Sequence, residues 1–451
     1  MRYIDKDLDS IQETRNLLLN AQLSFVQLQK LSQSELDEYS ASFIAALQKE
    51  ADTYISDFIK GNDYGNEEDE QFLCYQFLQR FQETIQQESY VGIINGNVDN
   101  QLIEIGVPLG VVVAVLPSHP TFSLLVNLVL LAMKSGNALV VVANKRSKSA
   151  TIDSFKCLIA LSEKCGFPEG SIAIAEIITD SGIMEVLRSD KVSLIVNIGC
   201  PEYITEQFQT NTSLIYGGEA SGPVFIERTA DIEQAVKDVI HSRSFHNGIL
   251  PGAEQFLVTE NVIADQIKQY MLENGAYILD ESETQKLREF LERSQKNITN
   301  SYIGKSAVWL AKMAGFTIPE TTSVLVSLQD YMNEEDFLNQ KLLCPIILVY
   351  LEPDWTLACI KCMSLLAELK MGHTLTIHST DWKVIREFAT VKSVGRIVVN
   401  APTVCAATGI TSNFSPSLIL GGITTGRGYS SENMTPKSWT YTRQVGFKIT
   451  T

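Results

Sequence analysis

The sequence predicts an α/β protein with parallel sheets covered by helices. Two short runs rich in β-branched residues, at 111–116 and 138–142, flank an apolar helical stretch at 123–133. A strand–helix–strand unit of this kind favours a parallel sheet. The alternation then continues with a helix at 150–165, a strand at 172–178, a helix at 183–188 and a strand at 194–196. This repetition is typical of a doubly wound, Rossmann-like sheet.

The chain ahead of this unit is predicted to be helical and then to form a hairpin. Apolar residues recur at helical spacing through 7–59 and again through 73–81, with a polar break at 61–66 between them. The pattern indicates two or more surface helices and then another. Residues 89–107 alternate and carry the turn signal Gly96-Asn97, which predicts a hairpin projecting from the body.

A second α/β section is predicted to start at 223. The run at 223–226 reads as a strand and 232–240 as a helix. Further strands are expected at 255–258, 323–326, 346–350 and 396–400. The sequence contains no internal repeat and no low-complexity tract. We therefore expect two α/β lobes in one compact protein.

Composition excludes several classes of protein. The 451 residues are 45% hydrophobic, which is enough for ordinary cores, and the net charge of −17, without a basic stripe, argues against a nucleic-acid partner. The most apolar region, 105–143, is interrupted by prolines, a lysine and a glycine, so no membrane span is expected. Eight scattered cysteines with no secretory leader indicate reduced thiols and a cytoplasmic location.

The ordinary phosphate-loop and metal motifs are absent. No Gly-x-Gly-x-x-Gly follows the first buried strand, and there is no Walker A sequence. Cys359 and Cys362 have the spacing of a redox or zinc pair, but no second pair accompanies them. We therefore expect no metal site.

Segments spread along nearly the whole chain resemble the CoA-acylating branch of the aldehyde dehydrogenase family, as found in acetaldehyde and propionaldehyde dehydrogenases and in the aldehyde dehydrogenase half of aldehyde-alcohol dehydrogenases. The matching segments, in family order, are VPLGVV at 107–112, LPSHPT at 116–121, CGFP at 165–168, TADI at 229–232, FHNGILPGAEQ at 245–255, MGHT at 371–374, RIVVNAP at 396–402 and SENMTPK at 431–437. No iron-dependent alcohol dehydrogenase half is expected, because the chain stops after the last of these segments.

The resemblance implies an aldehyde dehydrogenase-like fold with three parts. These would be a Rossmann-like cofactor-binding lobe at 1–88 and 105–222, an α/β catalytic lobe at 223–437, and an oligomerisation flap built from 89–104 with 438–451. The flap implies a homo-oligomer, and its exposed strands would also need pairing partners for physical reasons. A hetero-oligomer with a catalytically competent paralogue is the alternative.

Pro251 occupies the position of the family's catalytic cysteine. In the family, that thiolate attacks the aldehyde, hydride passes to NAD, and CoA cleaves the resulting thioester. A pyrrolidine ring cannot carry out these steps. Proline also lacks a backbone N–H, and the family oxyanion hole uses the backbone N–H of the nucleophile residue with an asparagine amide. One replacement removes both the nucleophile and an oxyanion donor.

Two further positions depart from the family pattern. His119 stands at the oxyanion asparagine position, where an imidazole can still donate one hydrogen bond. Lys341 stands at the position of a glutamate that binds the nicotinamide ribose, so an acceptor has become a cation with donors only.

The resemblance implies NAD or NADP and CoA as cofactors, with residues that both favour and oppose binding. Arg146 and Lys148 match a basic pair that could hold an adenosine phosphate or CoA, although a solvated loop would show the same charges. Gly199 matches a glycine that approaches the pyrophosphate. Glu202 replaces a nearby glycine, and its charge would repel a pyrophosphate.

Two functional hypotheses follow. The first is a family member that has lost thioester chemistry and persists as a binding, scaffold or regulatory subunit. The second is an active NAD(P)-dependent aldehyde or acyl-CoA oxidoreductase that uses a substitute residue such as Cys405, which lies in a loop that borders the family's substrate tunnel. A reactive thiol needs an activating environment, and the structure must show whether Cys405 has one.

Overall fold

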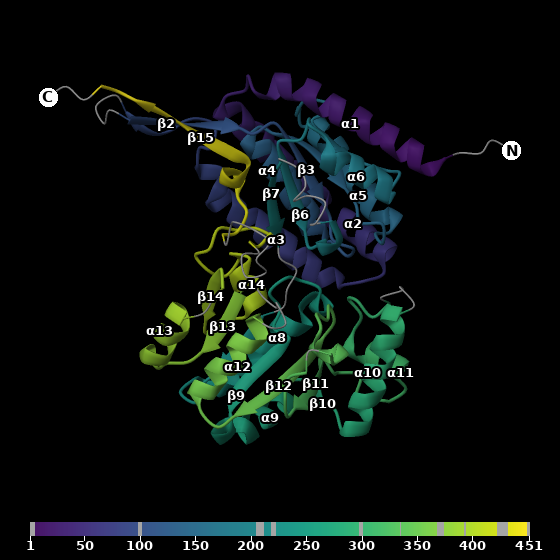
Figure 1. The fold of residues 1–451 in the computed structure, drawn as a ribbon, viewed down its shortest axis with the longest axis vertical. Helices are drawn as coiled ribbons and strands as arrows, with labels where there is room; N and C mark the ends of the chain where they lie inside the picture. Colours follow the sequence, from purple (N-terminus) through teal and green to yellow (C-terminus); the bar gives the residue numbers. More distant parts are fainter. Residues whose placement is uncertain are drawn as a thin grey trace.

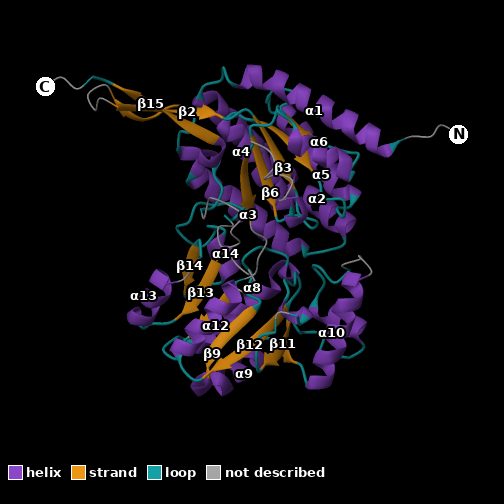
Figure 2. Cartoon of the chain, viewed as in Figure 1, coloured by secondary structure: helices purple, strands orange, loops and turns teal. Residues whose placement is uncertain are grey.

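The computed structural model describes residues 5–97, 102–203, 212–217, 222–296, 301–333, 335–367, 374–391, 394–421 and 432–448. Two α/β lobes lie one above the other, and a narrow three-stranded sheet projects from the upper one (Figure 1). We call these parts the N-terminal lobe, the C-terminal lobe and the flap. Both lobes carry helices on both faces of a parallel sheet, which confirms the predicted fold class (Figure 2).

The N-terminal lobe is built on a five-stranded parallel sheet with the order β5-β4-β3-β6-β7. The central strands β3, β4 and β6 are buried at every position, as expected for strands covered on both faces. Its elements are α1 (Lys6–Leu28), α2 (Gln33–Asn62), α3 (Glu67–Glu83), η1 (Ile85–Gln87), β3 (Val111–Val115), α4 (Phe122–Ser135), β4 (Ala138–Val142), α5 (Ser149–Lys164), β5 (Ile172–Ile174), α6 (Asp180–Arg188), β6 (Leu194–Ile198), η3 (Pro201–Tyr203) and β7 (Ser213–Gly217).

Local sequence explains where the helices of this lobe begin and end. Ser32 and Glu35 form a reciprocal capping box that starts α2. Thr121 caps α4, whose residues are all buried because other elements surround it, and Gly136 ends it in a left-handed conformation. These caps fix the entry to α4 directly after the turn that carries His119.

The C-terminal lobe is built on a seven-stranded parallel sheet with the order β10-β11-β12-β9-β8-β13-β14. Its elements are β8 (Pro223–Ile226), α8 (Ile232–Ser244), η4 (Phe245–Gly248), β9 (Phe256–Glu260), η5 (Asn261–Ile263), α9 (Ala264–Glu273), β10 (Ala276–Ile278), α10 (Glu281–Lys296), α11 (Ala307–Ala314), β11 (Val324–Gln329), η6 (Phe337–Asn339), β12 (Ile346–Glu352), α12 (Trp355–Ala367), β13 (Thr374–His378), α13 (Trp382–Val391), β14 (Arg396–Val399) and α14 (Thr403–Ala407). The short helix η8 (Pro436–Trp439), later in the chain, packs against α4 of the N-terminal lobe.

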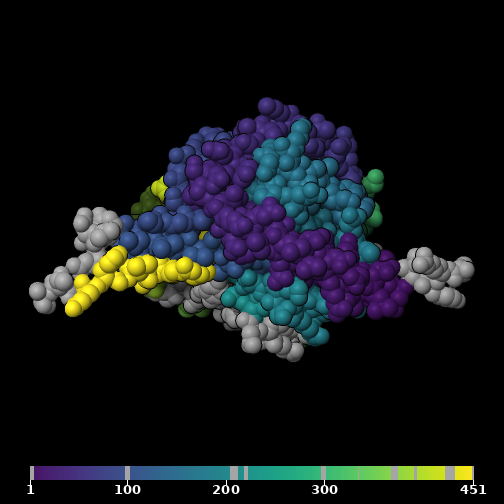
Figure 3. Space-filling view, turned by 90° about the horizontal axis from the view of Figure 1, so that it is seen from above, coloured from purple at the N-terminus to yellow at the C-terminus, as the bar shows by residue number. Residues whose placement is uncertain are grey.

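The flap combines segments that are far apart in the chain. It contains β1 (Gly92–Asn97), β2 (Leu102–Pro108) and β15 (Thr440–Gly446), all antiparallel, with β2 in the centre. It extends away from the N-terminal lobe in the view from above (Figure 3). The hairpin turn was predicted at Gly96-Asn97, but both residues pair with β2, so this prediction is wrong, and residues 98–101 between the two strands lie outside the described ones.

The sequence predictions differ from the structure at several elements. The predicted strand at 172–178 is shorter, ending at Ile174, and β7, β10, β13 and α9 were not predicted. The N-terminal lobe, the C-terminal lobe and the flap each contain one sheet, so their number matches the three parts that the family resemblance implies. The roles and boundaries assigned to those parts remain a prediction.

Candidate functional site between the two lobes

The sheet of the N-terminal lobe has a topological switch point between β3 and β6. The chain leaves β3 toward β4 on one side and leaves β6 toward β7 on the other. Open α/β sheets bind ligands in the crevice that such diverging loops create at the carboxyl ends of the strands. The loops that follow β3 and β6 carry His119 and Gly199, so the structure brings these two predicted positions to the same edge.

Polar contacts define this edge. The Cys200 thiol donates to the carbonyl of Leu116 over 3.0 Å, and the Asn144 amide donates to Glu202 over 3.3 Å. Gly199 is buried with φ +69°, a left-handed conformation that favours glycine, and its N–H donates to the carbonyl of Gly217. Gly199 therefore shapes the backbone here, and the carboxylate of Glu202 lies beside it.

His119 lies partly buried in the turn after β3. Its ring packs edge-on against Tyr64 with centroids 4.9 Å apart, and its Nδ1 lies 2.8 Å from the Ser118 hydroxyl. Burial lowers the pKa of His119 to about 4, helped by the positive charges of Lys148, Arg146 and Lys305. The imidazole is therefore neutral at pH 7 and keeps one N–H to donate.

A basic cluster surrounds His119. It consists of Arg146 and Lys148, which follow β4, and Lys305, which comes from the C-terminal lobe, and all three lower the pKa of the same imidazole. Lys305 is held by the carboxylate of Asp63 at 3.0 Å and by its carbonyl at 2.6 Å. Lys148 lies 3.9 Å from the same carboxylate. Two of these three cations thus share the carboxylate of Asp63, and all three act on one imidazole, an arrangement suited to phosphate groups.

The loop with Pro251 is locked to the N-terminal lobe by buried polar contacts. His246 accepts the N–H of Asn66 at its Nδ1 over 2.8 Å, and its Nε2 lies 2.8 Å from Glu70 Oε2. The His246 N–H donates to Asp69 over 2.7 Å. Glu70 is fully buried and also accepts the N–H and hydroxyl of Ser123, in the first turn of α4.

This buried arrangement also sets the charge state of Glu70. Burial by itself would raise the pKa of the Glu70 carboxyl, but the hydrogen bonds from His246 and Ser123 outweigh burial and leave it lowered. A short chain of polar contacts therefore joins the Pro251 loop to the helix that follows the His119 turn.

Lys341 lies beside the end of the Pro251 loop. The Gln255 side chain donates to the carbonyl of Gln340 over 2.7 Å and accepts the N–H of Leu342 over 2.9 Å. It is therefore hydrogen-bonded to both chain neighbours of Lys341. The buried Arg243 donates to the carbonyls of Leu342 and Ile346. The structure thus brings Lys341 and the Pro251 loop together, at the amino ends of β9 and β12.

Glu254 and Cys405 are buried neighbours on the other side of this loop. Thr403, the first residue of α14, donates its N–H to Glu254 over 3.1 Å and also donates its hydroxyl. Burial raises the pKa of Glu254 to about 7, against the opposing hydrogen bonds from Ser242 and Thr403. Cys405 is 3% exposed, and burial together with the charges of Glu254 and Asp69 raises the pKa of its thiol to about 12.

Three residues of this site were not found from the sequence. Lys305, Asp63 and Tyr64 belong to loops with no periodic pattern or motif, and only the packing of the two lobes brings them to His119. His246 and Glu254 lie inside the segment that carries the resemblance. No pattern around His246 indicates that its partner is Glu70, which lies 176 positions earlier.

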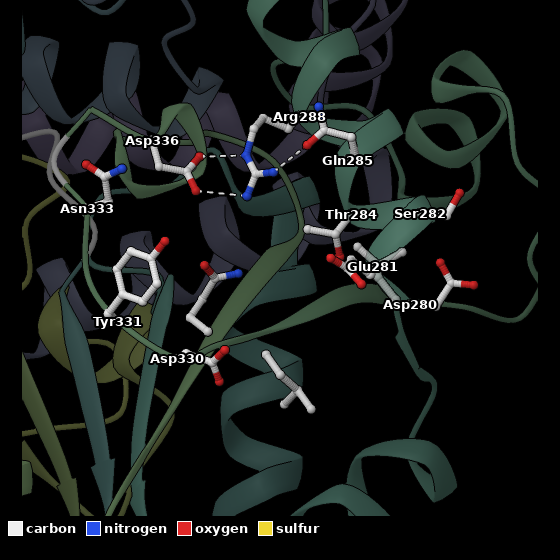
Figure 4. Close-up of a pocket in the computed structure, with 13 residues that line it drawn as sticks. Asp280, Glu281, Ser282, Thr284, Gln285, Arg288, Asp330, Tyr331, Asn333 and Asp336 are labelled. Carbon is white, nitrogen blue, oxygen red and sulfur yellow. Dashed lines mark hydrogen bonds and ion pairs between the residues drawn. The ribbon is translucent and has the colours of Figure 1, made fainter.

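A separate cavity of about 840 Å³ lies at the carboxyl ends of β10 and β11 (Figure 4). Its lining is largely polar, and Arg288 reaches across it to Asp336 through two contacts of 2.9 Å. It contains none of the residues predicted from the sequence. Because the strands are parallel, it lies at the opposite edge of the sheet from Pro251, which precedes β9.

Within the described ranges, no cluster of three or more histidine, cysteine or acidic residues has the arrangement of a metal site. A search of the same residues for a helix with the length and apolarity needed to cross a bilayer found none.

Comparison with known proteins places these features in context. The profile described as "Aldehyde dehydrogenase family" matches residues 12–284. The succinate-semialdehyde dehydrogenase (acetylating) of Clostridium kluyveri is 26% identical over 435 residues, covering 96% of this chain and 95% of the relative. The acetylating aldehyde dehydrogenase of Geobacillus thermoglucosidasius has a structure with a TM-score of 0.94 at 29% identity, covering 100% of this chain and 99% of that one.

A more distant structure shares the fold. Propionaldehyde dehydrogenase of Rhodopseudomonas palustris, solved with bound CoA and an acylated cysteine, has a TM-score of 0.82 at 20% identity, covering 96% of this chain and 97% of that one.

Proposed function

The chain belongs to the CoA-acylating branch of the aldehyde dehydrogenase family, and from this premise we propose that it has lost thioester chemistry while keeping a binding role. The observation that carries the proposal is Pro251 in the position of the nucleophile. The ligand we propose is a phosphate-bearing cofactor, CoA or a nicotinamide dinucleotide, held at the basic cluster. The protein then acts as a binding, scaffold or regulatory subunit.

Loss of chemistry follows from what proline can offer. Covalent catalysis of acyl transfer needs a nucleophilic atom with a lone pair that can attack carbon, and the side chain of Pro251 has none. The missing N–H also removes one donor from the oxyanion hole, and removal of a single donor of this kind costs roughly 10²–10³ in rate. The neutral ring of His119 offers one donor in place of the family asparagine.

The rival hypothesis, an active oxidoreductase using Cys405, has weaker support. A thiol whose pKa is about 12 is almost wholly protonated at pH 7, and Cys405 is 3% exposed. Cys344, which follows Lys341 in the chain, is fully buried with its pKa also raised by burial to about 12. The rival predicts NAD-linked turnover that disappears in Cys405→Ser.

The residues of the candidate site fit phosphate better than they fit the nicotinamide ribose. Arg146, Lys148 and Lys305 supply three cations around one neutral imidazole, which suits the pyrophosphate or ribose phosphate of CoA. Lys341 and Glu202 stand where the resemblance expects an acceptor and a glycine. A bound dinucleotide would supply hydride acceptance and CoA would supply a thiol for acyl transfer.

We also propose that the flap pairs with a second subunit. Its strands expose Ile93, Leu102, Tyr441 and Val445, whose exposed fractions run from 36% to 66%. A small sheet of this kind, with open edges, gains stability from association. The partner is a second copy of this chain or a catalytically competent paralogue, and co-expression followed by native mass spectrometry distinguishes the two.

The test is NADH consumption with short acyl-CoAs by the wild type and by Pro251→Cys, with CoA binding measured calorimetrically on both. The proposal expects a silent wild type that binds CoA. Revival in Pro251→Cys would show that only the thiol was lost. Turnover by the wild type at rates typical of enzymes would refute the proposal and direct attention to Cys405. Absence of CoA binding would refute CoA as the ligand, and absence of calorimetric binding by NADH as well would refute the ligand assignment.

A further inference from the structure

We propose that Lys305 and Asp63 couple the basic cluster to the conformation of the loop 245–251, so that binding of a phosphate at the cluster changes the conformation of the loop that carries Pro251. The inference rests on the proposed phosphate binding for its ligand. The coupling itself can be tested without any ligand.

The first link is the contact between Lys305 and Asp63. Asp63 ends α2 in a left-handed conformation, with φ +56°, and its carboxylate is 74% exposed. Although the Lys305 side chain is only 19% exposed, its partner carboxylate is solvated, and ion pairs to a solvated partner contribute little stability and can be exchanged for another anion. A ligand phosphate, carrying more charge than one carboxylate, can therefore replace Asp63 as the partner of Lys305. Such a replacement changes the contacts of the α2–α3 turn.

The second link is a set of hydrogen bonds among three segments. The Gly65 N–H donates to the carbonyl of Gly304 over 3.0 Å. The Asn247 side-chain amide donates to both the Gly65 carbonyl, at 3.1 Å, and the Gly304 carbonyl, at 3.0 Å. We call Gly65, Gly304 and Asn247 the hub. It lies one residue from Lys305, two from Asp63 and four from Pro251.

Close packing makes the hub sensitive to small shifts. A Cβ placed on Gly304 would lie 2.9 Å from Tyr64 Cβ and 3.0 Å from Ile249 Cγ2. The same residue thus separates Tyr64, which contacts His119, from the Pro251 loop. Movement of Gly304 cannot be absorbed by empty space on either side.

The third link is a strained element in the loop itself. His246 and Asn247 both adopt left-handed backbone conformations, with φ +52° and ψ 33° and 34°. Such a conformation costs about 1–3 kcal/mol for a residue such as His246 and less for asparagine, which tolerates it, and at His246 it persists because surrounding contacts impose it. Here those contacts come from the N-terminal lobe, through Gly65, Asn66 and Asp69. Weakening the hub therefore lets the loop relax.

Amide hydrogen exchange on the ligand-free protein tests the coupling. Lys305→Met is expected to raise exchange of the amides at 246–250 about fivefold or more, because local opening there becomes easier. Lys312→Met, at an exposed position on α11, makes the same change in charge and should leave those amides unchanged. Asp63→Asn provides a second variant, since asparagine tolerates the left-handed backbone, and it should act in the same direction.

The outcomes separate the coupling from the ligand. Unchanged exchange at 246–250 in both Lys305→Met and Asp63→Asn would overturn the inference. Raised exchange in both, with Lys312→Met unchanged, supports it whatever the ligand proves to be. Added CoA should then shift exchange at 246–250 in the wild type and not in Lys305→Met. CoA that binds calorimetrically without that shift would also overturn the inference, whereas absent CoA binding refutes the proposed ligand and leaves the ligand-free result to decide the coupling.

Discussion

Replacing Glu70 with glutamine tests the buried contact between the two lobes. The wild-type carboxylate accepts two hydrogen bonds from Ser123, at 2.8 and 2.6 Å, and lies 2.8 Å from His246 Nε2. Glutamine keeps the volume and one carbonyl, but its NH₂ would face Nε2. The imidazole cannot change to the tautomer in which Nε2 accepts a hydrogen bond, because Nδ1 already accepts the N–H of Asn66. Two donors would therefore oppose each other in a buried position.

The magnitude follows from these contacts. Loss of a buried hydrogen bond to a charged group costs about 1.5–3 kcal/mol, and conversion of the bonds from Ser123 to neutral ones adds a smaller loss. Relief from burying a charge offsets part of this. We expect Glu70→Gln to lower the free energy of unfolding by about 2–3 kcal/mol at pH 7. Glu68→Gln, at an exposed position on the same helix, should change it by less than about 0.5 kcal/mol.

The assay is urea unfolding followed by tryptophan fluorescence, repeated from pH 7 to pH 4. Because the pKa of Glu70 is lowered in the folded state, its carboxylate stabilises the protein above the unfolded pKa of about 4.3. That contribution is lost as the pH falls through the folded pKa. The difference between wild type and Glu70→Gln should therefore stay complete from pH 7 down to about pH 5 and begin to shrink only as the pH falls to about 4, below the unfolded pKa. A difference below about 1 kcal/mol at pH 7, or one that grows in acid, would refute this account.

Three further predictions use other buried groups. Burial raises the pKa of Glu254 to about 7, so the contribution of this group to wild-type stability should fall as the pH rises from about 4.5 to 7. In the same unfolding assay, the free energy of unfolding of Glu254→Gln relative to the wild type should therefore rise by about 2–3 kcal/mol from pH 5 to pH 8. Parallel pH curves for the two proteins would contradict this prediction. In native protein at pH 8, iodoacetamide should label the exposed Cys157 and leave Cys405 unlabelled by mass spectrometry; early labelling of Cys405 would favour the rival hypothesis. In thermal unfolding, Gly65→Ala should lower stability by about 2–4 kcal/mol more than Gly315→Ala. Both glycines have φ above +80°, but only at Gly65 would the new Cβ meet the buried imidazole of His246, at 2.3 Å. Similar losses of stability in the two variants would show that backbone strain alone matters.

Several elements that the sequence predicted well have fully buried residues, whereas β13, also buried at every position, was missed because threonines and a histidine interrupt its apolar run. The β-branched runs of β3, β4 and β6 are buried at every position, and the apolar helix between β3 and β4 is buried throughout. Edge and short strands such as β7 and β10 carry weaker patterns, because only part of each is covered. Burial on both faces leaves a continuous apolar run in the sequence, and partial burial does not.

The residues of the candidate site also divide into those that the sequence could identify and those that it could not. Pro251 and His119 could be identified because they lie inside segments that resemble a family, and Lys341 because it precedes Pro345 by four residues, as the family glutamate precedes the proline of a similar turn. Lys305 could not, because its role depends on how one lobe packs against a turn of the other. The contact between Glu70 and His246 likewise joins residues 176 positions apart. Contacts made by tertiary packing between loops leave no local signal in either segment.

The order of strands in the flap has a consequence for synthesis of the chain. The central strand β2 pairs along its whole length with β15, from Pro108 opposite Thr440 to Leu102 opposite Gly446. A ribosome must add more than 330 residues after β2 before its second partner exists. Until then β1 and β2 form an isolated hairpin, which is marginally stable in water, and one edge of β2 stays open to other nascent chains. Pulse-labelled ribosome complexes stalled before residue 440 should therefore depend on chaperones more than released chains do.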